Sequence, residues 1–393
     1  MANPVYQALP TTIFSVMTGL ARETGAINLG QGFPDESGPR AIREKAAAAI
    51  LDGDNQYPPM PGLPELRQAV AAHYRRTQGL DLDWAGEVTV TSGATEALAC
   101  ALLALIAPGD EVVLFQPLYD SYLPMVRRAG GEGRLVALQP PSWRFDRAML
   151  EQAFNERTRL VVLNTPLNPT ATICPDEDLA LLAEFCVRHD AIAVCDEVWE
   201  HVVFDGRAHR PLISFPGMRE RTVKIGSAGK MFALTGWKVG FLMAAPALTG
   251  LLAKAHQFLT FTTPPGLQAA VAWGLANSDG WFAAMPADLA RSRDRLAEGL
   301  RREGFAVLDS QGTYFLNIDL AGSGVFEADM DFCLRAVREA GVAAIPVSAF
   351  YETDPVTSIV RLCFAKRDET LDEGVRRLAK ARDLSLRAHN SAR

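Results

Sequence analysis

The chain has 393 residues, 48% of them hydrophobic, so it can bury a large core and is longer than a single ordinary domain requires. Its formal net charge is −7 and it contains no long basic run, which argues against nucleic acid and anionic membrane surfaces as partners. Six cysteines are scattered through apolar segments without a CxxC pair, and we predict that they are buried reduced thiols.

The sequence also lacks the marks of export and membrane insertion. Its first residues do not combine a basic region with an apolar stretch, and no apolar run reaches the roughly 18 residues that a membrane span needs. We therefore expect a protein of the cytoplasm whose partners are small molecules.

Three regions follow one another along the chain. Residues 1–45 are rich in turn residues, and we expect them to pack against a small C-terminal domain. In residues 46–280, β-branched runs alternate with Ala- and Leu-rich stretches, which predicts a large α/β domain with a mainly parallel sheet and helices on both faces. Residues 281–393 predict a small α+β domain. Strands of the large domain are expected at 88–91, 111–115, 160–164, 192–195, 223–226 and 240–243.

The first candidate site motif is TSGATEAL at residues 91–98, which follows a predicted strand and opens a helix. The free backbone N–H groups of Gly93, Ala94 and Thr95, together with the helix dipole, would attract an anion such as a phosphate. The alternative is an ordinary helix start, capped by the serine, threonine and glutamate side chains of the motif. The motif by itself leaves both interpretations open.

Polar residues end two later strands. Asp196 follows the strand at 192–195, where its carboxylate could keep a ring nitrogen protonated, although an acid at such a place is also a common helix cap or metal ligand. Asn168 lies in the rigid, proline-containing turn LNTPLNPTA at 163–171. That turn can aim the amide of Asn168 into a cleft or can simply be a capped loop.

Lys230 lies just beyond the strand at 223–226, among small residues that leave room for a planar ligand. A lysine amine attacks an aldehyde only when it is neutral, so a catalytic lysine needs a dry site and nearby positive charge to lower its pKa. Lys238 can supply such a charge. Lys230 is therefore the candidate Schiff-base lysine.

Three further residues are candidates with simpler alternatives. Arg361 interrupts the apolar run at 359–364, so it is either a buried anion-binding residue or an outward residue of an edge strand. Tyr119 follows a strand end and could stack on a flat ring, and Tyr57 is a second aromatic candidate. Either tyrosine could instead be an ordinary packing residue.

Taken together and in this order, the motifs resemble those of fold type I pyridoxal-phosphate aminotransferases. Within that class, the chain is similar to the kynurenine, glutamine and methionine aminotransferase group over nearly its whole length. The segments that carry the similarity are PTTIFSVM at 10–17, NLGQGFPD at 28–35, NQYPPM at 55–60, SAGK at 227–230, TGWKVG at 235–240 and GTYF at 312–315.

The resemblance implies pyridoxal 5′-phosphate as the cofactor and a homodimer as the assembly. It implies that Lys230 forms the Schiff base with the cofactor and that Asp196 pairs with the ring nitrogen. Asn168 would contact the ring hydroxyl and the substrate carboxylate, and Tyr119 would stack on the ring. Arg361 would bind the α-carboxylate of the substrate with two parallel hydrogen bonds.

The resemblance further implies how the phosphate and the substrate side chain are held. The backbone of the motif at 91–98, Ser227 and Lys238 would hold the phosphate, joined by Tyr57 from the other subunit. Gly32 and its neighbours would form part of the pocket for the substrate side chain.

One position departs from the pattern. Most relatives have tyrosine three residues after the cofactor aspartate, and this chain has Trp199. An indole N–H can donate a hydrogen bond, but it lies elsewhere and cannot ionise as a phenol does. We expect the pKa of the cofactor Schiff base to differ from that of close relatives.

The resemblance implies transamination by a ping-pong mechanism, in which the freed Lys230 moves the α-proton of the amino acid. Methionine, glutamine, phenylalanine and kynurenine-like amino acids are the expected donors, and no feature of the sequence chooses among them. A β-lyase acting on cysteine conjugates and a ligand-sensing domain without activity are the alternatives. A nicotinamide-dependent oxidoreductase is disfavoured because no GxGxxG follows a strand.

Overall fold

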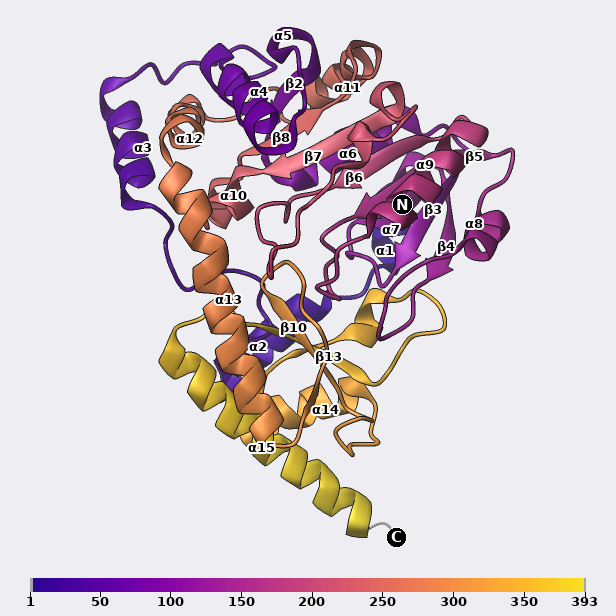
Figure 1. Cartoon of the computed structure of the whole chain (residues 1–393), viewed down its shortest axis with the longest axis vertical. Coiled ribbons are helices and arrows are strands. Elements are labelled where there is room, and N and C mark those ends of the chain that lie inside the picture. Colours follow the sequence, from indigo (N-terminus) through magenta and orange to yellow (C-terminus); the bar gives the residue numbers. More distant parts are fainter. Residues whose placement is uncertain (1–2, 392–393) are drawn as a thin grey trace.

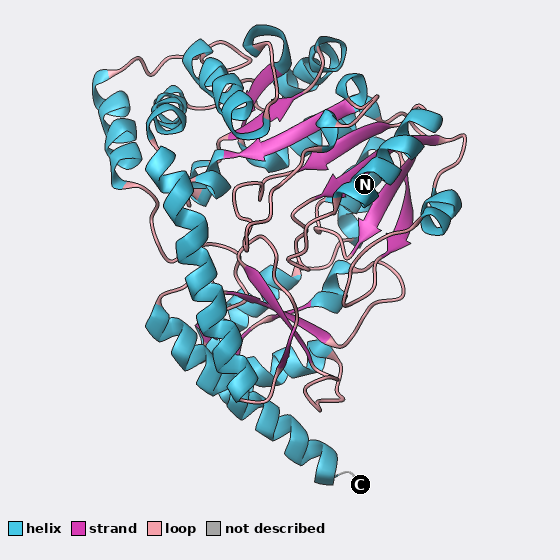
Figure 2. Cartoon of the chain, viewed as in Figure 1, coloured by secondary structure: helices cyan, strands magenta, loops and turns pink. Residues whose placement is uncertain are grey.

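The computed structural model describes residues 3–391, and its main feature is a seven-stranded sheet. The sheet is visible in Figures 1 and 2. The four neighbour pairs from β7 to β4 are parallel, whereas β8 runs antiparallel to both β2 and β7. This arrangement confirms the predicted α/β fold with a mainly parallel sheet. The spatial order is β2 (Val88–Thr91), β8 (Gly240–Met243), β7 (Thr222–Ser227), β6 (Ile192–Asp196), β5 (Thr158–Asn164), β3 (Glu111–Gln116) and β4 (Glu132–Ala137).

All six strands predicted for this sheet are present, and the sequence missed only the outer strand β4. A strand stands out in a sequence when its inward-pointing side chains are apolar and buried, and β4 has few buried side chains. Its first three residues, Glu132 to Arg134, are exposed and include a glycine. Without the apolar pattern of a central strand, β4 does not stand out in the sequence.

Helices cover both faces of the sheet, because successive side chains of a central strand pack alternately into two different cores. Val112 and Leu114 of β3 pack in one core with α6 and α7, while Val113 and Phe115 pack in another core with α8 and α9. A third core joins β2 and β8 to α3, α4 and α12. These helices are α6 (Gly93–Leu105), α7 (Tyr122–Ala129), α8 (Arg147–Ala153), α9 (Asp176–Arg188), α3 (Arg40–Asp52), α4 (Pro64–Gln78) and α12 (Pro265–Asn277).

A smaller antiparallel sheet lies below the large one in Figure 1, and the long helix α13 runs from one sheet to the other. Its order is β12 (Ile345–Pro346), β13 (Ile359–Cys363), β10 (Phe315–Asp319) and β9 (Ala306–Val307). The N-terminal strand β1 (Ile27–Asn28) pairs in parallel with β11 (Val342–Ala343). We keep the division of the chain at residues 45 and 280 as a proposal.

The remaining helices frame these sheets. Helix α13 packs along α15, and α11 packs against α6 behind the large sheet. Their bounds are α1 (Pro4–Ala8), α2 (Ile13–Thr24), α5 (Trp84–Glu87), α10 (Ala228–Met231), α11 (Pro246–Leu259), α13 (Asp279–Arg302), α14 (Asp329–Arg335) and α15 (Asp368–Ser391).

The register of the large sheet brings chemically active residues to one edge. Asn164 and Asp196 are paired at the carboxyl ends of β5 and β6. Because β8 is antiparallel, its first residue, Gly240, pairs with the last residues of β2 and β7, which are Thr91 and Ser227. The carboxyl ends of β2, β5, β6 and β7 therefore meet along one side, where α/β folds place their sites.

Two predictions about the rest of the chain can be compared with the structure. All six cysteines are free, as predicted; five of them are buried, whereas Cys174 is only partly buried, contrary to the prediction. Among the residues that the structure describes, no helix is both long enough and apolar enough to cross a bilayer.

Candidate active site

A cavity of about 220 Å³ opens at the carboxyl edge of the large sheet. With the exception of Tyr57, every residue predicted to bind the cofactor lines this cavity, although these residues come from segments far apart in the sequence. The lining is Gly93, Ala94, Thr95, Leu98, Tyr119, Tyr122, Asn164, Asn168, Asp196, Val198, Trp199, Ser227, Gly229, Lys230, Thr235 and Lys238.

One end of the cavity is built to receive an anion. The first turn of α6 faces it, and the Nζ of Lys238 lies 3.5 Å from Thr95 Oγ1. A Cβ at Gly240 would lie 2.6 Å from the backbone of Gly93, so only glycine lets β8 approach this turn so closely. Glu96 accepts from the backbone N–H of Ser92 at 2.7 Å, so part of the capping interpretation also holds. Capping by Glu96 and anion binding are compatible, because the cap uses the N–H of Ser92 and leaves the N–H groups of the first turn of α6 available to an anion.

At another wall of the cavity, Asp196 presents an oxygen without a partner. Its Oδ2 accepts from the hydroxyl of Tyr122 at 2.6 Å, whereas its buried Oδ1 has no hydrogen-bond partner among the described residues. Burial raises the pKa of Asp196, and the Tyr122 hydroxyl and the nearby Lys230 act in the opposite direction. A buried acceptor without a donor is costly, so Oδ1 is suited to a cationic N–H of a ligand.

Lys230 stands beside Asp196 with the properties expected of a nucleophilic amine. Its pKa is lowered to about 8, mainly by loss of solvation and in part by the positive charges of Arg361 and Lys238. Its Nζ donates to the hydroxyl of Tyr314 at 3.1 Å and lies 4.6 Å from the ring centroid of Trp199. A substantial fraction of this amine is therefore neutral near pH 8.

Arg361 reaches the same place from the small sheet. It lies on β13, between β10 and β12, and is only 1% exposed, which excludes the outward edge-strand alternative. Its Nη1 donates to Asn168 Oδ1 at 2.6 Å and its Nη2 to the carbonyl of Gly30 at 2.8 Å. Its Nε has no partner, and no carboxylate of the described residues lies within 4.0 Å of the guanidinium. Burial lowers the pKa of Arg361 to about 10.

A chain of hydrogen bonds joins Arg361 to the edge of the large sheet. Asn168 donates from its backbone N–H to Asn164 Oδ1 at 2.9 Å, and Asn164 Nδ2 donates to the carbonyl of Asp196 at 2.8 Å. Because Asn168 Oδ1 is engaged with Arg361, its Nδ2 is the atom left to donate into the cavity.

Three predicted residues lie outside the cavity lining: Arg361, which contacts the lining residue Asn168, and Gly32 and Tyr57. Gly32 accepts from the hydroxyl of Tyr314 at 2.5 Å, and a Cβ at Gly32 would come within 2.8 Å of the Phe315 ring. Gly32 is therefore close to Lys230 through Tyr314. Tyr57 is 83% exposed, contacts Phe261 edge to face at 5.5 Å, and does not reach the cavity of its own chain.

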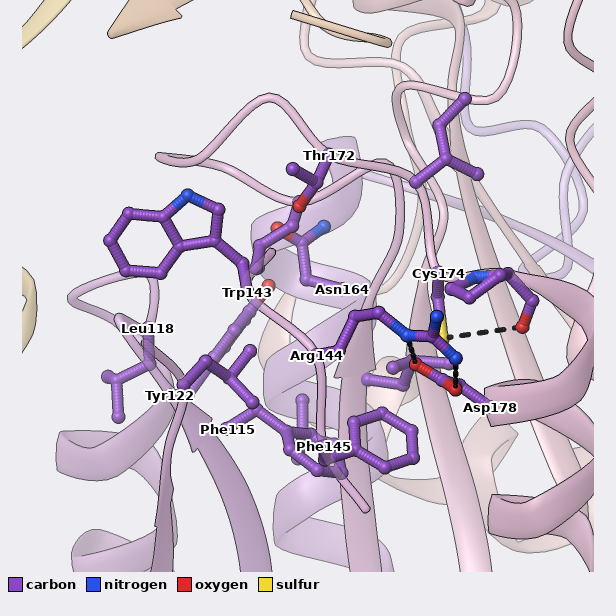
Figure 3. A pocket seen from close by; sticks show the side chains of 16 residues that line it. Phe115, Leu118, Tyr122, Trp143, Arg144, Phe145, Asn164, Thr172, Cys174 and Asp178 are labelled. Atoms are coloured by element: carbon purple, nitrogen blue, oxygen red, sulfur yellow. Dashed lines mark hydrogen bonds and ion pairs between the residues drawn. The ribbon is translucent and has the colours of Figure 1, made fainter. Parts of the chain in front are cut away.

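A smaller cavity of about 30 Å³ shares Tyr122 and Asn164 with the first and is shown in Figure 3. Its basic residue, Arg144, points at Asp178 and binds both of its carboxylate oxygens, at 2.9 and 2.6 Å. This cavity is too small for an organic cofactor and its cation is already paired. The cavity of about 220 Å³ is the better candidate site.

Two buried charged groups lie outside both cavities. Lys224 of β7 is fully buried and pairs with Glu197 and with Glu200, the latter at 2.6 Å; we call these three residues the Lys224 cluster. Beside α6, His256 Nδ1 lies 2.8 Å from Glu96 Oε1 and its Nε2 lies 3.0 Å from the carbonyl of Met60.

Three residues of the site were missed by sequence reasoning. Tyr122 holds Asp196, Asn164 positions Asn168, and Tyr314 contacts Lys230. A signal existed only for Tyr314, which lies in the GTYF segment, and for Asn164, which begins the proline-containing turn. Tyr122 is an ordinary first residue of a helix in the sequence, and its role depends on the packing of α7.

The donor and acceptor set fits pyridoxal 5′-phosphate. The unpartnered Asp196 Oδ1 suits a protonated ring nitrogen, and the first turn of α6 with Lys238 suits a phosphate. Between these ends lies the amine of Lys230, which can bond to an aldehyde.

Comparison with known proteins agrees with this fit. A family model described as aminotransferase class I and II matches residues 24–378. A probable N-succinyldiaminopimelate aminotransferase of Mycobacterium tuberculosis is 46% identical over 380 residues, which is 94% of this chain and 96% of the relative. A methionine aminotransferase of Escherichia coli is 41% identical over 370 residues, with coverage of 94% and 96%. The solved structure of the N-succinyldiaminopimelate aminotransferase from M. tuberculosis has a TM-score of 0.94 at 45% identity, covering 97% of this chain and 100% of that one.

Proposed function

The chain belongs to the aminotransferase class I and II family and is a pyridoxal phosphate-dependent transaminase, and from this premise we propose that Lys230 carries the cofactor. The observation that supports the proposal most is the pairing, in one cavity, of a lysine with a pKa near 8 and an aspartate oxygen without a partner. The nicotinamide-dependent alternative is set aside by the family. Amino acids and 2-oxo acids are the substrates of this reaction.

Each wall of the cavity has a proposed part in holding the cofactor. When bound, pyridoxal phosphate supplies an aldehyde that captures an amino group and a ring that takes up electrons. Asp196 Oδ1 would accept a hydrogen bond from the protonated ring nitrogen and so keep that nitrogen protonated. Lys238, Ser227 and the first turn of α6 hold the phosphate, and Tyr119 packs on the ring.

Substrate binding and proton transfer fall to three residues. The free N–H groups of Arg361 bind the α-carboxylate, and Asn168 Nδ2 donates to the ring hydroxyl and the same carboxylate. Lys230, once released, takes the proton from the α-carbon of the substrate at its Nζ and returns one on the way to the product. Its lowered pKa favours the neutral form that this step needs.

We propose that the amino donors have neutral or aromatic side chains, such as methionine, glutamine, phenylalanine or kynurenine. Support comes from the aromatic surroundings of Arg361, whose guanidinium carbon lies 3.9, 5.2 and 5.4 Å from the ring centroids of Phe315, Phe14 and Phe350. The methionine aminotransferase relative supports the same class.

A donor screen tests this choice. Purified enzyme is offered single amino acids with several 2-oxo acids, and N-succinyldiaminopimelate is included because a relative of 46% identity is named for it. A kcat/KM highest for N-succinyldiaminopimelate would contradict the neutral and aromatic class. Release of ammonia and pyruvate from cysteine conjugates, at a rate above that of transamination, would favour the β-lyase alternative.

We also propose a homodimer in which Tyr57 completes the site of the other subunit. Tyr57 is exposed and its ring contacts that of the exposed Phe261; Ile50 and Leu51, a few residues before Tyr57, and Phe258, three residues before Phe261, are exposed as well. Large apolar side chains that gather on a surface mark a site of interaction. The position of Tyr57 supports a partner that covers these side chains.

A mixing experiment tests whether Tyr57 acts across the interface. Lys230→Ala and Tyr57→Ala enzymes, each of low activity, are dissociated, mixed and reassembled. A mixed dimer would then contain one site with both residues intact, so activity should rise well above that of either parent. Absence of any rise, with mixed dimers verified by native mass spectrometry, would contradict the proposal.

We keep a cytoplasmic location as a proposal, supported by six free cysteines, which persist in a reducing compartment.

A further inference from the structure

Tyr314 occupies a fixed position between Lys230 and the N-terminal segment. It is buried immediately before β10, and its ring meets Trp199 edge to face with a centroid distance of 4.3 Å. Its backbone carbonyl accepts from the N–H of Phe364 at 3.0 Å, which holds the main chain. The side chain therefore has little freedom to turn, and the place of its hydroxyl is set by packing.

The hydrogen bonds of this hydroxyl have a defined direction. A phenol has one proton, and Tyr314 gives it to the carbonyl of Gly32 at 2.5 Å. Its oxygen can then only accept from Lys230 Nζ, at 3.1 Å. Tyr314 consequently cannot donate to the lysine nitrogen and cannot occupy its lone pair.

We propose that Tyr314 is a positioning residue for the cofactor lysine, which holds Nζ through an acceptor-only hydrogen bond and leaves its lone pair free to face the ligand. This inference deepens the proposed function and rests on Lys230 as the cofactor lysine. A neutral amine that donates one proton to Tyr314 keeps its lone pair on another side. That orientation is needed both to attack an aldehyde and to take a proton from carbon.

The surroundings of Lys230 show why such a hold is needed. Lys230 lines the cofactor cavity and also a neighbouring cavity of about 400 Å³, which Tyr314 lines as well. Besides Lys230, this neighbouring cavity has more acidic than basic side chains along its wall: Asp35, Glu36, Asp288, Asp368 and Glu369 against Arg291, Lys366 and Arg367. Without a hydrogen bond to hold it, the Lys230 ammonium could turn toward these carboxylates. The hydrogen bond to Tyr314 restricts that movement of Nζ.

The other charged groups near Lys230 do not replace this contact. Asp196 raises the pKa of Lys230, and Arg361 and Lys238 lower it, all by charge alone. Cys363 lies near Lys230 and Tyr314, and burial raises the pKa of its thiol, so the thiol stays neutral near pH 7. Among the described residues, Tyr314 is the one whose side chain has a direct hydrogen bond to Nζ.

The test measures the pKa of Lys230 in the cofactor-free protein, from the pH dependence of its acetylation, read by mass spectrometry. A hydrogen bond to a charged donor is stronger than one to a neutral donor, so loss of the Tyr314 oxygen should favour the neutral amine. In Tyr314→Phe we expect an apparent pKa lower by about one unit. We also expect capture of pyridoxal phosphate, compared at a pH where the amine is neutral in both proteins, to slow by about tenfold or more.

Tyr351→Phe is the matched control, because it also removes one hydroxyl that donates to a carbonyl, that of Leu138 at 2.8 Å, with no contact to Lys230. It should leave the lysine pKa unchanged. An unchanged pKa in Tyr314→Phe, or an equal shift in the control, would overturn the proposal. If Tyr314→Phe does not fold, 3-fluorotyrosine placed at 314 alone provides a poorer acceptor; it should shift the pKa in the same direction, and no shift would overturn the proposal.

The outcomes separate this inference from the proposed function. If the cofactor bonds to Lys230 but the pKa of Lys230 does not depend on Tyr314, the positioning role of Tyr314 is wrong and the proposed function stands. If the pKa of Lys230 depends on Tyr314 but no cofactor bonds to Lys230, the positioning role stands and the proposed function is wrong.

Discussion

Replacing Arg361 by methionine removes the guanidinium from a fully buried position while keeping most of the side-chain volume. In the native protein, Nη1 and Nη2 each have one partner, Nε has none, and no carboxylate among the described residues is within ion-pair distance. A buried cation without a counterion is unfavourable unless a ligand provides one. The substrate α-carboxylate is the anion that the account assigns to it.

The expected loss follows from the hydrogen bonds that such a carboxylate would make. Each hydrogen bond to a charged group contributes about 1.5–3 kcal/mol, so a bidentate contact is worth about 3–6 kcal/mol. Its removal in Arg361→Met should lower kcat/KM by about two to four powers of ten. Arg361→Lys keeps the charge but not the bidentate hydrogen-bonding geometry. The decrease in log(kcat/KM) should therefore be about half as large as in Arg361→Met.

The assay compares each donor with the amine that lacks its α-carboxylate. Wild-type enzyme should strongly prefer the amino acid, and Arg361→Met should lose most of that preference. Stability serves as the control, because the loss of two internal hydrogen bonds is offset by no longer burying a cation without a counterion, and we expect a change of less than about 2 kcal/mol in urea unfolding. If Arg361→Met prefers the amino acid over the amine by the same factor as the wild-type enzyme, Arg361 does not bind the α-carboxylate.

Three further predictions concern stability and pH. Lys224→Met should lower the free energy of unfolding by about 3–5 kcal/mol, measured in urea, because it leaves two carboxylates of the Lys224 cluster buried without their cation; a loss below about 1 kcal/mol would speak against a charged cluster. Burial lowers the pKa of His256, but the neighbouring Glu96 outweighs burial and raises that pKa above its ordinary value. The protonated His256 therefore stabilises the folded protein fully below about pH 6.5, and this stabilisation is lost as the pH rises through the raised pKa. The difference in unfolding free energy between wild type and His256→Asn should therefore narrow as the pH rises above 6.5, and a difference that grows would contradict the sign. Trp199→Tyr should lower the pH midpoint of the cofactor absorbance change, since a phenol can donate to the ring oxygen and favour the deprotonated form, and an unchanged titration would argue against a role for Trp199.

The sequence predicted residues that act at strand ends better than residues that meet across the fold. Asp196 and Lys230 follow central strands whose apolar runs are easily recognised, so the edge on which they lie could be inferred. The orientation of Asn168 could not, because it depends on Arg361, 193 residues away in the chain. The link between Tyr314 and Gly32 spans 282 residues and arises only when β10 and the N-terminal segment come together.

Tyr57 illustrates the opposite case. Its segment was recognised by similarity, yet nothing in its local sequence indicates whether it acts within its own chain. The structure places it on the surface, 83% exposed and outside the cavity of its own chain, whereas the resemblance implies a role in the cavity of the other subunit. The mixing experiment tests that role.

The most direct test of the account is to find the atom that bonds to the cofactor. Purified enzyme is reduced with borohydride, which fixes a Schiff base as a stable amine, and its peptides are mapped by mass spectrometry. We expect the added mass of reduced pyridoxal phosphate on Lys230, and a protein without the label in Lys230→Ala. Label on a different lysine, or retention of a covalent adduct in Lys230→Ala, would contradict it.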